Sequence, residues 1–89
     1  MSKIDLLHCR VCGYKSKDPP WGADGQTPLF DLCECCGVEH GYEDATPAGA
    51  RVFREKWVKS GAHFRLLRQK PIDWILDEQF QHVPHEFKD

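Results

Sequence analysis

The chain has 89 residues, of which 40% are apolar and 29% are charged, and its net charge is −2. A chain this short buries too small a core for high stability, so such domains often rely on a metal ion or on disulfide bonds. No apolar run approaches the roughly 20 residues that a membrane-spanning helix needs, and no signal-peptide core precedes the first cysteine. These features predict one small cytoplasmic domain that does not enter a membrane.

The charged residues fall into three blocks of alternating sign. Residues 1–50 carry four basic and eight acidic side chains, residues 51–70 carry seven basic and one acidic, and residues 71–89 carry one basic and five acidic. Clustered Lys and Arg can contact nucleic-acid phosphates, but the solvated face of a helix has the same composition. We therefore predict another protein as the partner, with nucleic-acid binding through residues 51–70 as the alternative.

The first predicted elements are two short strands within residues 6–15, joined by a turn at Cys12 and Gly13. Residues 17–28 are rich in Pro, Gly and Asp and predict a loop. Within it, we expect Trp21 to cover the small core, whereas an exposed Trp21 would mark a partner-binding surface. Residues 29–33 alternate between apolar and polar, which is typical of a strand that leads into the second turn.

Thr46 and Pro47 predict the start of a helix, because Thr offers a capping oxygen and Pro fits the first helical position. The helix should continue to Lys59 and stop at Gly61. Its apolar stripe is predicted to consist of Ala50, Phe53 and Trp57, with Val58 as a further candidate.

Pro71 predicts the start of a last helix. The side chains expected to reach the core from this region are Trp74, Ile75 and Phe80. From His82 onward we expect an irregular tail, because Pro84 interrupts any helix there.

Two Cys-x2-Cys pairs, separated by 20 residues, carry the clearest chemical signal in the sequence. Two thiolates at this spacing can bind one metal ion from a single tight turn, and two such turns complete a tetrahedron. A glycine follows each pair, Gly13 and Gly37, where the backbone often needs a positive φ. The predicted metal ligands are Cys9, Cys12, Cys33 and Cys36.

Zinc is the predicted metal, and iron is the alternative because four thiolates bind either ion. The remaining cysteine, Cys35, is predicted to be a surface bystander, with a reactive thiol or a substitute ligand as alternatives. We expect His8 and His40 to lie in the outer shell of the site or in solvent, and His82 and His85 to be surface residues. The sequence contains no Ser/His/Asp signature and no phosphate-binding glycine loop, so we do not predict an enzyme.

The segment Cys-Arg-Val-Cys-Gly-Tyr from residue 9, together with Pro19-Pro20 and the segment Phe-Asp-Leu-Cys-Glu-Cys-Cys-Gly-Val-Glu from residue 30, resembles small cysteine-rich bacterial proteins. These proteins are of zinc-ribbon or rubredoxin-like type and include the CPCC group. The resemblance covers about residues 8–44, and Arg-Val and Glu-Cys stand where the CPCC pattern has Pro-Cys. Most members have no known function.

We therefore predict a small α+β fold, in which a zinc-ribbon, rubredoxin-like β-hairpin unit precedes two helices. Residues 1–45 would form the metal-binding unit, and residues 46–89 a helical extension packed on it. The predicted function is a protein-interaction or regulatory module with a structural zinc ion. The alternatives are a rubredoxin-like electron carrier that holds iron and a nucleic-acid-binding zinc ribbon.

Overall fold

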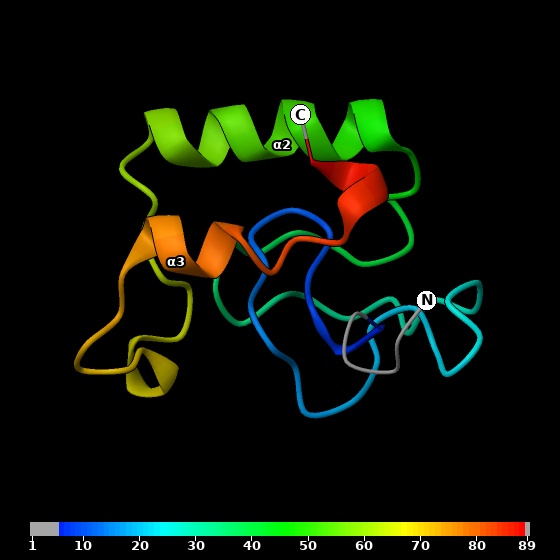
Figure 1. Ribbon diagram of the computed structural model, residues 1–89, viewed down its shortest axis with the longest axis horizontal. Helices are drawn as coiled ribbons and strands as arrows, with labels where there is room; N and C mark the ends of the chain where they lie inside the picture. The colour runs from blue at the N-terminus through cyan, green and yellow to red at the C-terminus, as the bar shows by residue number, and fades with distance from the viewer. Residues whose placement is uncertain (1–5, 89) are drawn as a thin grey trace.

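The computed structural model describes residues 6–88. Two α-helices lie wholly within them, α2 (Pro47–Lys59) and α3 (Leu76–Phe80), together with the short 3-10 helices η1 (Leu67–Gln69) and η2 (His85–Phe87). In Figure 1, α2 runs along one edge of the molecule, η2 packs against it, and the irregular first half of the chain lies beside them. None of the described helices has the length and hydrophobicity that crossing a membrane requires.

The predicted β-hairpin unit is wrong. The described residues contain no strand or sheet, only two isolated antiparallel bridges, between His8 and Lys15 and between Leu32 and Glu39. Each bridge closes one cysteine turn and goes no further. Beyond the first bridge the chain reaches Pro19 and Pro20, which have no N–H group for a strand ladder. The fold therefore consists of two short turns, each with one cysteine pair, followed by a second half that contains α2 and α3. It is not a zinc ribbon followed by helices.

The predicted first helix is confirmed as α2, which covers Pro47–Lys59. The Thr46 hydroxyl accepts the N–H of Gly49 at 3.0 Å and satisfies one of the free donors at the helix start. Ala50 and Trp57 are buried and Phe53 packs against the core, as predicted, whereas Val58 is 44% exposed and does not reach the core. The helix thus places one apolar face on the cysteine-rich half.

The last helix begins later than predicted, at Leu76 and not near Pro71. Trp74 closes a turn with Pro71, and Ile75 is extended and 54% exposed, so Ile75 is not a core residue. The Trp74 ring packs edge-to-face on Phe64 at 5.7 Å between centroids, which fixes the chain before the helix starts. Phe80 reaches the core, as predicted.

The tail after His82 is not simply irregular, because it contains η2 and two buried side chains, Val83 and Phe87. The buried core therefore draws on both halves of the chain. From the first half it includes the five cysteines, Val11 and Val38, and from the second half Ala50, Trp57, Phe64, Val83 and Phe87.

Candidate metal centre

The four predicted ligands come together in the core. Their sulfur atoms all lie within 4.8 Å of one another, and all four side chains are buried. The Sγ atoms of Cys9 and Cys36 are 3.8 Å apart, and those of Cys12 and Cys33 are 3.7 Å apart. A tetrahedral ion with metal–sulfur bonds of about 2.3 Å has sulfur–sulfur edges of about 3.8 Å. The cluster therefore has the dimensions that a four-thiolate metal site requires.

Two short segments with the same backbone geometry build the cluster, and we call them the first knuckle (residues 8–15) and the second knuckle (residues 32–39). In the first, the Gly13 N–H donates to the Cys9 carbonyl at 3.0 Å, and in the second the Gly37 N–H donates to the Cys33 carbonyl at 3.0 Å. Both glycines have a positive φ, 82° and 81°, as predicted from their position after each pair.

A backbone N–H also points at the first sulfur of each knuckle. The Val11 N–H donates to Cys9 Sγ and the Cys35 N–H donates to Cys33 Sγ, both at 3.4 Å. Such donors stabilise a thiolate, because they place a partial positive charge beside the sulfur. The backbone of each knuckle therefore stabilises the ionised form of its first cysteine.

The four thiols cannot all ionise at neutral pH on their own. Burial raises the pKa of Cys12 and of Cys36 well above the ordinary value, whereas hydrogen bonds from neighbouring thiols, that of Cys12 first, hold the pKa of Cys33 well below it. Negative charges packed this closely need a cation among them. The donor set and its dimensions together fit a divalent metal ion.

Cys35 is buried and not the surface residue that its place inside the pair predicts. It holds the position in the second knuckle that Val11 holds in the first, and both side chains have no exposed surface. The Gln79 side chain donates to Cys35 Sγ at 3.3 Å and to the Cys12 carbonyl at 3.1 Å. Cys35 is not part of the four-sulfur cluster. The structure thus gives it a packing role against α3.

His40 is buried and not exposed to solvent, with 2% of its surface accessible. Its Nδ1 lies 2.8 Å from Asp44 Oδ2, and Asp44 also accepts the Trp21 Nε1–H and the Gly41 N–H. Burial lowers the pKa of His40, but the carboxylate of Asp44 and the nearby Cys33 sulfur outweigh it and raise the pKa to about 10. His40 and Asp44 therefore form a buried pair beside the second knuckle.

Sequence reasoning missed the pairing of His40 with Asp44. The four-residue spacing was the available signal, but no helix was expected there, and the segment folds as consecutive turns. His8 is also buried, and its Nδ1 lies 2.9 Å from the Gly13 carbonyl, so it braces the first knuckle. His82 and His85 are exposed, as predicted, although the His82 ring stacks on His8 at 4.9 Å.

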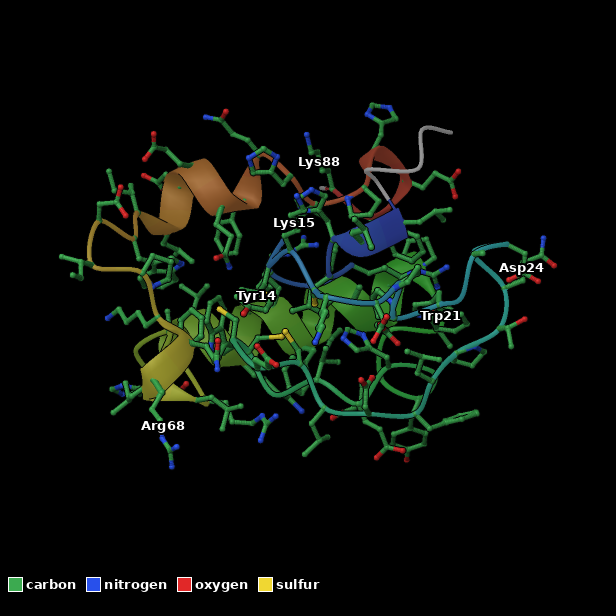
Figure 2. All side chains as sticks on the ribbon, turned by 90° about the horizontal axis from the view of Figure 1, so that it is seen from below. Tyr14, Lys15, Trp21, Asp24, Arg68 and Lys88 are labelled. Atoms are coloured by element: carbon green, nitrogen blue, oxygen red, sulfur yellow. The ribbon has the colours of Figure 1, made fainter. Side chains whose placement is uncertain are left out.

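Trp21 is only partly buried, and it covers Arg10 more than it covers the core. The Arg10 guanidinium lies 3.8 Å from the centre of the Trp21 ring and 4.4 Å from that of Phe87, which are cation–π distances. Figure 2 shows Trp21 and Asp24 together toward one end of the molecule, with Arg68 at the other end and Tyr14 beside sulfur atoms between them.

Two arginines of the basic block bind the knuckles. Arg54 donates to the carbonyls of Val11 at 2.6 Å, Arg10 at 3.0 Å and Phe87 at 2.7 Å. Arg65 donates to the carbonyls of Cys33 at 2.8 Å and Leu32 at 3.3 Å. Each knuckle therefore has one arginine from the second half of the chain on its backbone oxygens.

The chain is similar to two uncharacterized proteins of Bacillus subtilis (strain 168). YozI is 32% identical over 72 residues, which cover 63% of this chain and 60% of YozI. YoaQ is 33% identical over 69 residues, which cover 60% of this chain and 58% of YoaQ. The chain thus spans about three fifths of the length of these relatives.

No family model matches the chain, and no solved structure matches it. The comparisons therefore agree with a resemblance to bacterial proteins without an assigned role. They do not confirm a zinc-ribbon or rubredoxin-like family.

Proposed function

We propose that the protein is a small interaction or regulatory module whose fold is held by one zinc ion on Cys9, Cys12, Cys33 and Cys36. The observation that carries this proposal is the buried cluster of four sulfurs with tetrahedral spacing. Bound zinc would supply the positive charge that lets all four thiols ionise, and it would join the two knuckles.

The arrangement supports a structural role for the metal. A catalytic zinc site keeps one position open for water or substrate, whereas four cysteines close a tetrahedral site. All four side chains are buried, so no substrate has direct access to the ion. Function is then carried by the surface that the metal holds in shape.

Metal analysis of the purified protein tests the proposal. We expect one zinc ion per chain, and we expect a strong chelator to remove it with loss of far-UV and near-UV circular dichroism. Unchanged spectra after complete metal removal would contradict the structural role. A red protein that contains iron and shows a reversible redox wave would favour the electron-transfer alternative.

An exposed apolar segment supports interaction with another protein. Between Arg65, which binds the second knuckle, and Trp74, which packs on Phe64, the chain exposes Leu67 to 73% and Ile72 fully. Large aliphatic side chains exposed on one short segment whose two ends are held in place are candidates for contact with another protein.

The basic residues support nucleic-acid binding less than their number suggests. Arg54 and Arg65 donate to backbone carbonyls and Lys70 lies over the Trp74 ring, so at least three of the seven cations in residues 51–70 already have partners. Nucleic-acid bases stack on exposed aromatic rings, but Phe64, which lies in the same basic block, is buried. We therefore propose a protein partner in preference to a nucleic acid.

Matched surface variants test the partner class. We expect Leu67→Ser with Ile72→Ser to abolish capture of the partner by the metal-loaded protein, whereas Val52→Ser, also exposed but on α2, leaves capture intact. Equal capture by both variants would remove this segment from the interface. Binding of a DNA or RNA oligomer that weakens steeply with added salt would favour the nucleic-acid alternative.

A further inference from the structure

A second group of exposed apolar side chains lies in the first half of the chain. Phe30 is 64% exposed, Leu32 is 48% exposed and Tyr42 is 74% exposed. None of the three is among the residues that form the core, so packing within the chain does not account for their size. Their apolar surface is therefore free to contact another molecule.

Two backbone segments bring these side chains to one region of the surface. The His40 N–H donates to the Asp31 carbonyl at 2.9 Å, so the two segments lie beside each other. A Cβ atom on Gly41 would lie 2.7 Å from the Phe30 ring, which shows that this ring packs on the second segment. Because Tyr42 follows Gly41 directly, the two aromatic residues occupy adjoining parts of the surface.

The backbone holds Phe30 in a conformation that is unfavourable for a bulky residue. Its φ is 56°, in the left-handed region that such side chains rarely adopt. Strain of this kind persists where the surrounding structure fixes one residue in place, and it is often found at binding sites. An aromatic ring that is already fixed loses less conformational entropy when a partner binds. Phe30 is therefore suited to be an anchor for a partner.

The charge of this region indicates the kind of partner. Residues 18–50 contain seven acidic residues and no Lys or Arg. Two of the acids, Asp31 and Glu39, lie on the same two segments, and within the described part of the chain neither carboxylate has a hydrogen bond or an ion pair. Arg65 reaches this region, but its guanidinium donates to backbone carbonyls. A partner that brings Lys or Arg would gain ion pairs with the acids and cation–π contacts with the rings.

We propose that five residues form a docking surface for a basic segment of another protein, in which Lys or Arg residues are interspersed with apolar residues. This acidic aromatic surface consists of Phe30, Asp31, Leu32, Glu39 and Tyr42. The inference rests on the proposed interaction role and adds a second contact surface to it. The acids attract and orient the basic segment, and the apolar side chains supply most of the affinity. The same negative charge repels phosphate groups, so nucleic acids and anionic lipids do not fit this surface.

Peptide binding to the full-length, metal-loaded protein tests this surface. The probe is a fluorescent peptide of Arg-Ser-Leu repeats, and fluorescence anisotropy measures its affinity. Peptides of Glu-Ser-Leu repeats and of Arg-Ser-Ser repeats test whether positive charge and apolar side chains are both needed. We expect the Arg-Ser-Leu peptide to bind about tenfold more tightly than either control, with an affinity that falls as salt is added.

Matched variants locate the binding site. Phe30→Gly removes the ring and suits the positive φ, so this variant should keep its metal and its fold but bind the peptide about tenfold less tightly. Asp31→Asn with Glu39→Gln keeps the shape of both side chains and should remove most of the salt dependence. Leu67→Ser with Ile72→Ser, which changes the other exposed apolar segment, should bind the peptide as the wild type does.

Equal affinity for the Arg-Ser-Leu and Glu-Ser-Leu peptides would overturn the inference, and so would unchanged affinity in Phe30→Gly. If Phe30→Gly fails to fold, Tyr42→Ser decides, because it alters a side chain that is 74% exposed and should also weaken binding. Sedimentation that shows self-association of the wild type, abolished in the variant that folds, would assign this surface to a second copy of the chain and overturn the proposed occupant.

The outcomes also distinguish this inference from the proposed function. A chain that binds no metal would overturn the proposed function, whatever its affinity for the peptide. A metal-loaded chain whose affinity for the Arg-Ser-Leu peptide does not depend on Phe30 or Tyr42 would overturn the acidic aromatic surface alone.

Discussion

The two knuckles have the same backbone hydrogen bonds but different surroundings. The first knuckle lies against α3 and the residues that follow it, so that a Cβ atom on Gly13 would lie 2.2 Å from the Gln79 carbonyl oxygen. The second knuckle has more space, because a Cβ atom on Gly37 would lie 3.5 Å from the Arg65 side chain. Equal local geometry therefore does not imply equal tolerance of substitution, which depends on what packs over the turn.

The largest effect is expected from the ligands, which should be equally necessary in both knuckles. Cys9→Ser and Cys33→Ser should each lose the metal and unfold the module, because structural zinc contributes roughly 10–16 kcal/mol in small zinc domains. Metal content and thermal unfolding measure this.

Cys35→Val is the matched control for the ligand variants, since it gives the second knuckle the residue of the first. It should keep the metal and change the free energy of unfolding by less than about 1.5 kcal/mol. Loss of the ion from Cys35→Val would show that the fifth thiol is a ligand.

The two glycines should separate the knuckles most clearly. Gly37→Ala should lower the free energy of unfolding by about 1–2 kcal/mol, because alanine is strained at the positive φ of this position. Gly13→Ala has the same backbone strain and an added clash with the Gln79 carbonyl, so we expect the free energy of unfolding to fall by about 2–5 kcal/mol. Chemical denaturation of the metal-loaded variants measures both, and equal losses would mean that the packing over the first knuckle is loose.

The two arginines should show a smaller contrast in the same direction. Arg54→Met leaves three partly buried carbonyls without this donor, so we expect a loss of about 3 kcal/mol. Arg65 is exposed, and water can replace it on its two carbonyls, so Arg65→Met should lose about 1 kcal/mol. Denaturant midpoints compare the two, and a larger effect at Arg65 would reverse the ranking of the knuckles.

The smallest effect concerns the bond between Tyr14, in the first knuckle, and Glu34, in the second. Tyr14 Oη donates to Glu34 Oε2 at 2.7 Å, and burial, followed by this carboxylate, raises the pKa of Tyr14 above its usual value of about 10. The folded state holds this proton more tightly than the unfolded state. Its contribution to stability is therefore complete below about pH 10 and is lost as the pH rises through the raised pKa.

Glu34→Gln should lower the pKa of Tyr14 toward its usual value. Ultraviolet titration measures this in a Tyr42→Phe background, where Tyr14 is the remaining tyrosine. An unchanged titration curve would show that burial alone sets the pKa of Tyr14.

The sequence predicted what depends on neighbours along the chain. The spacing of the cysteines, the glycine after each pair and the Thr46-Pro47 start of α2 are local signals, and each feature appears where it was expected. That the four cysteines bind zinc stays a prediction.

Features that depend on distant parts of the chain were missed. Alternation in residues 29–33 predicted a strand, but within residues 6–88 no partner strand pairs with this segment, and Leu32 forms one isolated bridge, to Glu39. Cys35 was expected on the surface, yet α3 covers it through Gln79, which is 44 residues away. Burial of His40 likewise depends on Trp21, which shares Asp44 with it.

The Arg54 side chain donates hydrogen bonds to the carbonyls of both Val11 and Phe87, and this affects the order in which the chain folds during synthesis. The four predicted ligands leave the ribosome before Arg54, and the Arg54 side chain gains its third carbonyl acceptor only when Phe87 follows. Such distant contacts form late, because closing a long loop is slow. We therefore expect a nascent chain to bind its metal ion before the first knuckle is fully packed, and the segment that contains Phe87 to complete that packing afterwards.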